Sequence, residues 1–315
     1  MPYELDHRLV VGVASSALFD LTESHDAFLQ GLDHYRAHQE EHADEPLAPG
    51  VAFPFIERLL GLNDLAPTDR PVEVFVLSKN DPVTGLRVMK SIEHHGLSIS
   101  RALFTEGTAP YAYIRALNIS LFLSGNRADV DDAIALGHSA GVVLGSAAVG
   151  NSEPNDSAVR IAFDFDGVLA SDEAEQIYQA DGIERFRANE VEQRATPLSP
   201  GPLHAFVTAL TRIQRLELAR RDVDPSYVPR IRISIVTARD APAHERAVTT
   251  LREWGFKVDD AFFLGGVAKD RVLRVLQPHI FFDDQDKMLS PVADSVASVL
   301  IPSGIMNRPT AAQVT

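Results

Sequence analysis

The chain has 315 residues, a length that predicts two domains of ordinary size, each able to bury a hydrophobic core. It has no cysteine, which excludes disulfide bonds, thiolate metal sites and a cysteine nucleophile. The 44 acidic residues outnumber the 29 Lys and Arg residues and give a formal net charge of -15, so nucleic acid is not an expected partner and an anionic substrate needs a local cation.

The N-terminal segment lacks the features of a targeting signal. It carries acids where a secretory signal carries Lys or Arg, and the apolar run 9–13 ends at Ser15 and Ser16. No apolar run approaches the ~20 residues that a membrane-spanning helix needs. We therefore expect a soluble, cytoplasmic protein with no membrane partner.

Short apolar segments alternate with amphipathic helical segments along the chain, a pattern typical of an α/β protein with mostly parallel strands. The segments predicted to form strands are residues 9–13, 72–77, 159–163, 231–236, 261–264 and 280–282. Residues 151–157 are polar and have the composition of a linker that divides the chain nearly in half. The tail after residue 302 is predicted to be loosely structured.

The two halves of the chain resemble each other in sequence. Residues 47–50 (LAPG) recur as residues 198–201 (LSPG), an offset of 151 residues. Several Gly, Ala, Phe, Arg and Leu residues between 96 and 122 recur between 255 and 281 at an offset of 159. Extra polar residues around 220–227 account for the difference between the offsets. Chance similarity of two α/β segments is the alternative, but constant offsets favour an internal duplication.

Two acids follow the predicted strand 159–163. Asp164 and Asp166 are separated by one residue, so both leave the strand on the same side and reach the carboxyl end of a sheet, where α/β proteins bind ligands. Two such acids repel unless a divalent cation neutralises one and the other holds a proton, as an aspartyl nucleophile beside a general acid/base requires. Taken alone, the pattern also fits a surface turn or a calcium loop.

Three further groups stand at or just after the ends of predicted strands. Thr237 places a hydroxyl at a strand end, where it can bond a phosphate oxygen, and Lys269 opens a predicted helix with a cation that suits an anion. Asp283 and Asp284 are hard oxygen ligands of the kind that Mg²⁺ takes. Each group alone is more often structural, but their order at four strand ends favours a single site.

This order of motifs resembles that of the haloacid-dehalogenase superfamily of phosphatases over roughly residues 158–302. The whole chain is similar to the cytosolic type I 5'-nucleotidase family in residues 15–19, 91–96, 171–173, 236–239 and 278–285. The resemblance implies two haloacid-dehalogenase-like units, each a Rossmann-type, doubly wound parallel sheet. Residues 1–150 would form a degenerate, non-catalytic unit, and residues 158–315 a catalytic unit with a small cap inserted at about 172–228.

The resemblance also implies an activity, the Mg²⁺-dependent hydrolysis of nucleoside 5'-monophosphates to nucleoside and phosphate. Asp164 would form an aspartyl phosphate and Asp166 would act as general acid and base. Mg²⁺ would be held by Asp164, the backbone carbonyl of Asp166, and Asp284, with Asp283 acting through water. The residues expected to bind substrate are Gly167, Thr237, Arg239 and Lys269, of which Thr237 and Lys269 are also counted as catalytic.

Two other functions fit the same residues. One is a phosphatase for another small phosphorylated metabolite, or a phosphotransferase that passes the phosphoryl group to an alcohol. The other is a nucleotide-binding regulatory protein without turnover. The sequence also leaves the formation of a homo-oligomer open.

The offsets predict that the first half has lost the reactive groups. An offset of 151 places Val13 at the position of Asp164 and Ser15 at that of Asp166. An offset of 159 places Ser78 at Thr237, Pro110 at Lys269, and Ser124 and Gly125 at Asp283 and Asp284. With no nucleophile, lysine or metal carboxylate, the first half is expected to be catalytically silent.

Overall fold

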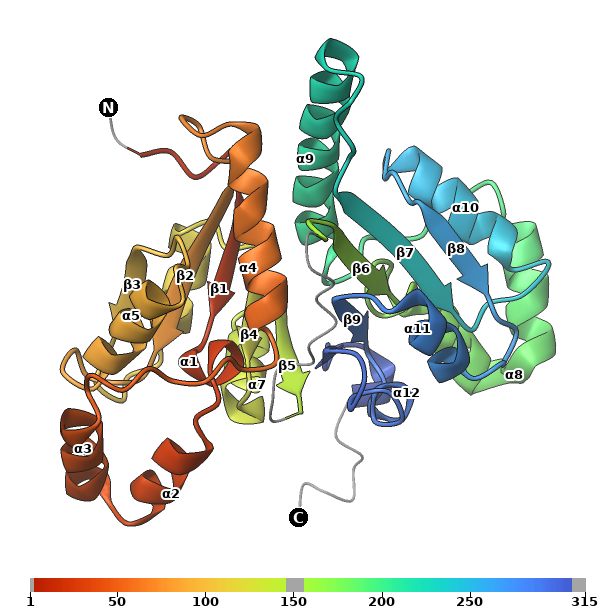
Figure 1. Ribbon diagram of the computed structural model, residues 1–315. Helices are drawn as coiled ribbons and strands as arrows, with labels where there is room; N and C mark the ends of the chain where they lie inside the picture. Colours follow the sequence, from red (N-terminus) through yellow and green to blue (C-terminus); the bar gives the residue numbers. More distant parts are fainter. Residues whose placement is uncertain (1–2, 146–155, 308–315) are drawn as a thin grey trace. The chain divides into compact units, whose positions relative to one another are not determined.

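The computed structural model describes residues 3–145 and 156–307, and the chain forms two compact units, residues 1–150 and 151–315 (Figure 1). Most of the predicted linker, residues 151–155, and the end of the predicted loose tail, residues 308–315, lie outside the described residues. Among the described residues, none of the helices has the length and apolar character that crossing a bilayer requires.

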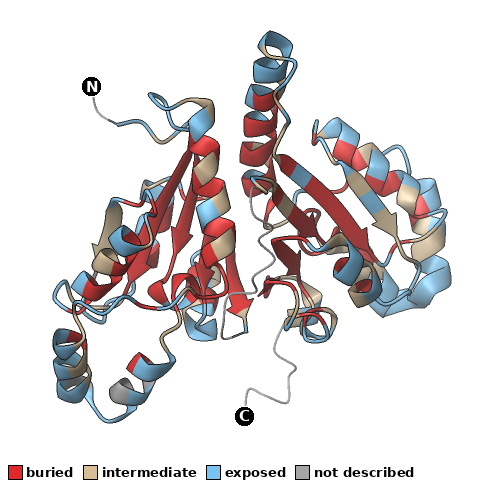
Figure 2. Ribbon diagram, viewed as in Figure 1, coloured by how far each residue is buried: buried red, intermediate tan, exposed pale blue. Residues whose placement is uncertain are grey.

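The first unit contains a parallel sheet in which the first strand of the chain is central. The strand order is β3-β2-β1-β4-β5, and the strands are β1 (Leu9–Val13), β2 (Val72–Ser78), β3 (Arg101–Phe104), β4 (Leu121–Ser124) and β5 (Ala140–Leu144). β1, β2 and β4 are buried along their whole length (Figure 2). Their nearly continuous apolar sequences suit strands that are covered on both faces.

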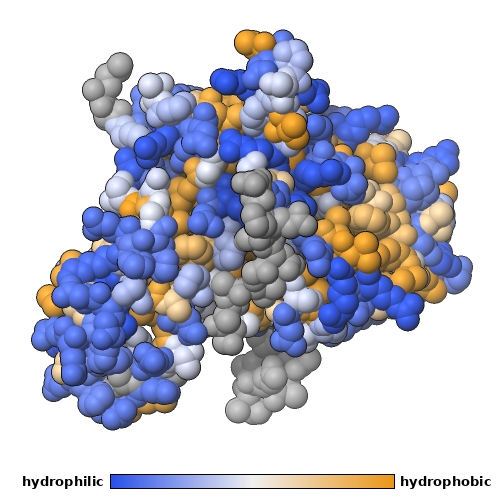
Figure 3. All heavy atoms as spheres, in the orientation of Figure 1, coloured by the Kyte–Doolittle hydropathy of each residue, from blue (hydrophilic) through white to orange (hydrophobic). Residues whose placement is uncertain are grey.

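Helices connect the strands of the first unit. They are α1 (Ser15–Leu18), α2 (Thr22–Leu29), α3 (Leu32–Glu41), α4 (Phe53–Gly61), α5 (Gly85–His94), α6 (Tyr113–Ala116) and α7 (Arg127–Ala135), with short 3₁₀ turns η1 (Leu62–Leu65) and η2 (Pro110–Ala112). α4 has a proline in its first turn and buries Phe55, Ile56 and Leu59 along one face. In contrast, the surface of α2 and α3 is mostly hydrophilic (Figure 3).

The second unit contains a parallel sheet with the order β10-β9-β6-β7-β8, and β6 is central. The strands are β6 (Val159–Phe163), β7 (Ile231–Thr237), β8 (Asp260–Phe263), β9 (Ile280–Asp283) and β10 (Ser298–Leu300). When the strands are numbered within each unit and the second sheet is read from β8 to β10, both sheets have the order third, second, first, fourth, fifth. This order puts the carboxyl ends of β6, β7 and β9 at one edge.

The helices of the second unit are α8 (Glu173–Glu192), α9 (His204–Val223), α10 (His244–Glu253), α11 (Lys269–Leu276) and α12 (Asp286–Leu289), followed by the 3₁₀ turn η3 (Ile305–Asn307). Phe206 of α9 packs on Phe163 and Phe282 of the sheet, with ring centroids 6.3 and 6.1 Å apart. α9 thus belongs to the layer that covers the sheet. The bounds of the insertion expected at about 172–228 contain both α8 and α9, and this cap stays a prediction.

The hydrogen-bond register of the two sheets gives a different offset between their central strands, β1 and β6, from the offset of 151 residues found in the sequence. Leu9 pairs with Val72 in the first unit, and Val159 pairs with Ile231 in the second. Because Val72 and Ile231 differ by 159 residues, the register aligns Leu9 with Val159, an offset of 150 rather than 151.

This register corrects the residue expected at the position of Asp164. The Ala14 N–H donates to Leu123 O, just as the Asp164 N–H donates to Phe282 O. Leu123 and Phe282 are related by the offset of 159, so Ala14, and not Val13, stands at the position of Asp164. The offset of 151 was wrong here because the turn after β6 has one residue more than the turn after β1.

Candidate functional site

Three acids from two neighbouring strands of the second unit meet at the carboxyl edge of its sheet. Asp164 directly follows β6, Asp283 ends β9, and Asp284 comes next. Each is buried, and one carboxylate oxygen from each lies within 4.8 Å of the others. The convergence predicted from the sequence follows from the pairing of β6 with β9, which brings the two strand ends side by side.

Lys269 supplies the cation of this cluster. It is the first residue of α11, and its Nζ lies 2.9 Å from Asp164 Oδ2 and 2.7 Å from Asp283 Oδ2. The residue is only 4% exposed, and burial by itself would lower the pKa of Lys269. The charges of Asp164 and Asp283 outweigh burial and raise the pKa above its ordinary value, so Lys269 stays protonated.

Asp164 is held in one orientation. Its Oδ1 accepts the Phe165 N–H at 2.7 Å, and its Oδ2 faces Lys269. Burial raises the pKa of Asp164 to about 7, with the charge of Lys269 acting against it and that of Asp283 adding to it. A carboxylate that is poorly solvated and fixed in place is a better nucleophile than one in water.

Asp284 shows that the residues fit a divalent cation. Its Oδ1 is buried and has no hydrogen-bond partner within residues 3–145 and 156–307. Burial, together with the charges of Asp164 and Asp283, raises the pKa of Asp284 to about 8. The three carboxylates thus share one cation, Lys269, which contacts Asp164 and Asp283. Mg²⁺ binds hard oxygen ligands whose negative charge is not otherwise compensated.

Gly167 leaves room for this acid. Its φ is +73°, and a Cβ at this position would lie 2.6 Å from Asp284 Oδ2. Both the left-handed backbone and the close approach of the carboxylate require glycine. Gly167 thereby shapes the acidic cluster as well as the turn after β6.

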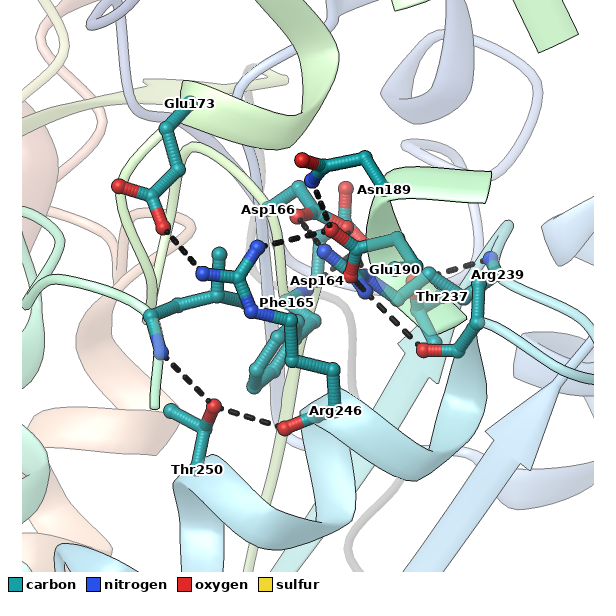
Figure 4. Close-up of polar contacts among 12 residues, drawn as sticks. Asp164, Phe165, Asp166, Glu173, Asn189, Glu190, Thr237, Arg239, Arg246 and Thr250 are labelled. Carbon is teal, nitrogen blue, oxygen red and sulfur yellow. Dashed lines mark hydrogen bonds and ion pairs between the residues drawn. The ribbon is translucent and has the colours of Figure 1, made fainter. Parts of the chain in front are cut away.

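Asp166 lies beside the cluster and is held by Arg239 (Figure 4). Arg239 Nε and Nη2 donate to the two oxygens of Asp166, each at 2.7 Å, and Nη1 donates to Glu190 and to the Ala243 carbonyl. All three guanidinium nitrogens are thus engaged, and Arg239 is only 4% exposed. Arg239 thus holds Asp166 and Glu190, and its expected role in binding substrate stays a prediction.

Thr237 stands where the sequence predicts it, at the end of β7 and fully buried. Its Oγ1 accepts the Arg239 N–H at 3.2 Å, which fixes the hydroxyl. Its own proton has no acceptor among the residues that the structure describes. The Thr237 hydroxyl is therefore able to donate a hydrogen bond to an anion.

Sequence reasoning missed Glu190. This residue of α8 has no exposed surface, and it accepts hydrogen bonds from Arg239 and from Arg246 of α10, the latter at 2.9 Å. Arg246 also donates to Glu173 at the start of α8, at 3.0 Å. A single glutamate in a helix rich in charged residues gives no local signal of burial, because its partners come from distant parts of the chain.

The beginning of the predicted loose tail contacts the site. Ser303 Oγ donates to the Gly167 carbonyl at 2.9 Å, and Asn307 Nδ2 donates to the Asp284 carbonyl at 2.7 Å. Asn307 also bonds the Ser303 carbonyl at 2.9 Å. The prediction of loose structure is therefore wrong for residues 303–307, whose polar side chains meet backbone groups that no local pattern reveals.

Comparison with known proteins gives a consistent result. A protein-family model described as 5'-nucleotidase matches residues 1–308. The Homo sapiens protein cytosolic 5'-nucleotidase 1B is 32% identical to the chain over 290 residues, which are 90% of this chain and 47% of that protein. The chain therefore spans about half the length of the curated relative that it matches. No solved structure is significantly similar to the chain.

Proposed function

Because the chain belongs to the 5'-nucleotidase family, we propose that it hydrolyses nucleoside 5'-monophosphates to nucleoside and phosphate. The observation that carries the proposal is the buried cluster of Asp164, Asp283 and Asp284 around Lys269. A fixed carboxylate and a permanent cation lie at this edge of the sheet, and the Thr237 hydroxyl stands at the end of the neighbouring strand β7. Transfer of a dianionic phosphoryl group requires groups of these kinds.

The residues of the cluster would hold Mg²⁺. Asp164 and Asp284 would offer side-chain oxygens, and the Asp166 carbonyl and Asp283, the latter through water, would complete the proposed set. When bound, Mg²⁺ would offset the negative charge of substrate and acids and stabilise the charge that develops on the phosphoryl oxygens.

Asp164 is the proposed nucleophile. A carboxylate oxygen of Asp164 attacks phosphorus in line, the new O–P bond forms, and the bond between phosphorus and the 5' oxygen breaks with its electron pair on that oxygen. The product of this step is an aspartyl phosphate. Lys269 and the Thr237 hydroxyl would donate to the phosphoryl oxygens, and the absence of a side chain at Gly167 leaves room for the carboxylate of Asp284.

Asp166 is the proposed general acid and base. In the first step it gives a proton to the 5' oxygen of the leaving nucleoside. In the second step it takes a proton from the water that attacks phosphorus, the bond between phosphorus and the Asp164 oxygen breaks with its electron pair on that oxygen, and phosphate is released. Each Asp166 oxygen accepts one hydrogen bond from Arg239 and keeps a second lone pair for this proton. Arg239 is then a positioning residue that fixes where the proton is delivered.

The test is phosphate release by the full chain with Mg²⁺, measured over a panel of nucleoside 5'-monophosphates and common sugar phosphates. We expect release from at least one nucleotide at a rate well above that of any sugar phosphate. Release from sugar phosphates alone would favour a phosphatase for another metabolite. Transfer of phosphate to an added alcohol in place of water would favour a phosphotransferase, and nucleotide binding without release would favour a regulatory protein. A cytosolic location is part of the proposal and is supported by the relative's name.

An internal duplication with a silent first unit is also part of the proposal. It is supported by the shared strand order and by the matching hydrogen bonds of Ala14 and Asp164. Ala14, Ser124 and Gly125 of the first unit bring no carboxylate to the positions of the acidic cluster. An experimental structure in which Ala14 did not superpose on Asp164 would contradict the duplication.

A further inference from the structure

The first unit has a cavity of about 980 Å³ at the carboxyl ends of β1, β2 and β4. Every residue that lines it belongs to the first unit, between residues 14 and 145. Strand order reverses between β1 and β4, and the crevice at such a point is where α/β sheets bind ligands. The volume is within the range of small-molecule sites. The unit that lacks the reactive acids has therefore kept a cavity at the same edge of its sheet.

Serine hydroxyls line this cavity and have unused hydrogen-bonding capacity. Ser15 is 6% exposed, and its Oγ makes no hydrogen bond in the part of the chain that the structure describes. Ser78 is also 6% exposed; its Oγ accepts the Asn80 N–H at 3.2 Å, while its proton has no acceptor among the same residues. A hydroxyl in a cavity wall that still has a donor or acceptor to offer can bond a polar group of a ligand.

The charges around the cavity disfavour an anion. The cations in its wall are already paired: Lys79 with Asp129 at 3.0 Å, and Arg36 with Glu106 at 3.3 Å. Arg127 is paired with Asp131 at 2.8 Å. The acids in the wall outnumber these cations, and they are Asp20, Asp26, Asp81, Glu106 and Asp129. A phosphate dianion would be repelled, so a ligand without negative charge suits this cavity.

Apolar side chains form another part of the wall. Phe19 and Tyr111 are both almost wholly buried and line the cavity, as do Leu77 and Val143. Aromatic and aliphatic side chains of this kind pack against the faces of a flat ring. A ligand that fits both the serine hydroxyls and the apolar side chains of the wall has a flat ring and hydroxyl groups.

We propose that the first unit binds an uncharged, hydroxyl-bearing ring compound of nucleoside size in this cavity. Choosing a nucleoside within this class rests on the proposed function, because a nucleoside is the product that the second unit would release. Binding in the first unit itself needs no catalysis and no metal.

Hydrogen–deuterium exchange of the full chain tests the proposal with adenosine as the probe. Added adenosine should slow exchange in peptides that cover residues 14–22 and 78–84, which line the cavity. The comparison ligand is AMP, added to Asp164→Asn protein so that no adenosine is formed, and it should give no protection in these peptides. Peptides around residues 164–170 report separately on binding at the second unit.

Two variants identify the cavity as the site. Ser15→Phe fills it and should abolish the protection of residues 14–22 and 78–84, and Ser78→Ala should weaken adenosine binding by about fivefold through the loss of one hydrogen bond. The matched control is Ser120→Ala, which removes a hydroxyl bonded to the Val10 carbonyl at the opposite end of β1 and should leave affinity unchanged. If Ser15→Phe does not fold, the adenosine affinity of Ser78→Ala tests the site.

The proposal is overturned if adenosine protects no peptide of the first unit, if AMP protects the first unit equally, or if Ser78→Ala binds adenosine as the wild type does. None of these outcomes depends on phosphate release. Failure of the proposed function would instead appear as absent turnover in the wild type, with protection of the first unit unaffected.

Discussion

At the scale of single residues, the balance of charge around Asp164 sets the chemistry of the second unit. Lys269 is the one cation within bonding distance of Asp164 and Asp283 among the described residues, and Asp284 has no such partner. Burial raises the pKa of Asp284 to about 8, so the protein alone does not support full ionisation of this acid at neutral pH. Each acid and the lysine can therefore be tested for a separate role.

Replacing Asp164 with Asn should abolish turnover while the protein stays folded. The change removes the nucleophilic oxygen and one negative charge but little volume, and phosphate release should fall at least ~100-fold, or about 2.7 kcal/mol of transition-state stabilisation. Steady-state phosphate release with circular dichroism as the folding control is the measurement. Activity at a tenth of the wild-type level would exclude Asp164 as the nucleophile.

Replacing Lys269 with Ala should lower turnover by about 100-fold, because it removes a buried charge that would otherwise face the phosphoryl oxygens. The matched control is Lys287→Ala, since Lys287 is exposed on the nearby helix α12 and should change turnover little. The measurement is the kcat of the two variants, compared with that of the wild type. A loss of less than about threefold in Lys269→Ala would show that this ammonium does not assist the reaction.

At the scale of elements, α8 is anchored to the site through one buried residue. Glu190 joins Arg239 after β7 to Arg246 on α10, and Arg239 in turn holds Asp166. Gly182, with φ +77°, separates the two helical segments of α8, so the C-terminal segment carries this anchor. The orientation of Asp166 thus depends on α8 through Glu190 and Arg239.

Arg239→Lys should lower kcat at least ~10-fold, about 1.4 kcal/mol, with little change in KM. Lysine cannot make the paired hydrogen bonds to both Asp166 oxygens, but a residue that does not touch substrate should not alter its binding. Arg187→Lys is the matched control, because Arg187 of α8 pairs with Asp240 at a partly exposed position. A large rise in KM at unchanged kcat would restore Arg239 as a substrate ligand.

At the scale of the whole molecule, the two units share one strand order but differ in the charge at the carboxyl edge of the sheet. In the second unit that edge holds three buried acids, whose mutual repulsion opposes folding unless a cation is bound. In the first unit Ala14 and Ser124 stand among hydroxyls and paired charges. Metal binding should therefore stabilise the protein through its second unit.

Thermal unfolding tests this expectation. Mg²⁺ at 100 times its Kd should stabilise the wild type by about 2.7 kcal/mol, and EDTA should reverse the shift and stop phosphate release. Asp284→Asn should unfold at a higher temperature than the wild type in EDTA, because one repelling acid is gone, and should gain nothing from Mg²⁺. Asp286→Asn, a change at an exposed acid two residues away, should behave as the wild type. Equal Mg²⁺ shifts in wild type and Asp284→Asn would exclude this site.

The α/β class, the strands that carry the acids and the family could all be predicted from the sequence, and the comparisons confirm the family. These features are local or periodic: an apolar run predicts a strand, and an acid at its end must lie at the sheet edge. The meeting of Asp164 with Asp283 could be predicted for the same reason, because parallel strands place their carboxyl ends together.

The contacts of each side chain could not be predicted from the sequence and are seen in the tertiary structure. Arg239 contacts both Asp166 and the buried Glu190, and the Asn307 side chain contacts the Asp284 carbonyl from a segment with no periodic pattern. Ala14 aligns with Asp164 because the turn after β6 has one residue more than the turn after β1. The hydrogen-bond register shows this difference, and a constant sequence offset does not. Such contacts join residues far apart in the chain, and their free energy depends on packing and desolvation that a linear pattern does not encode.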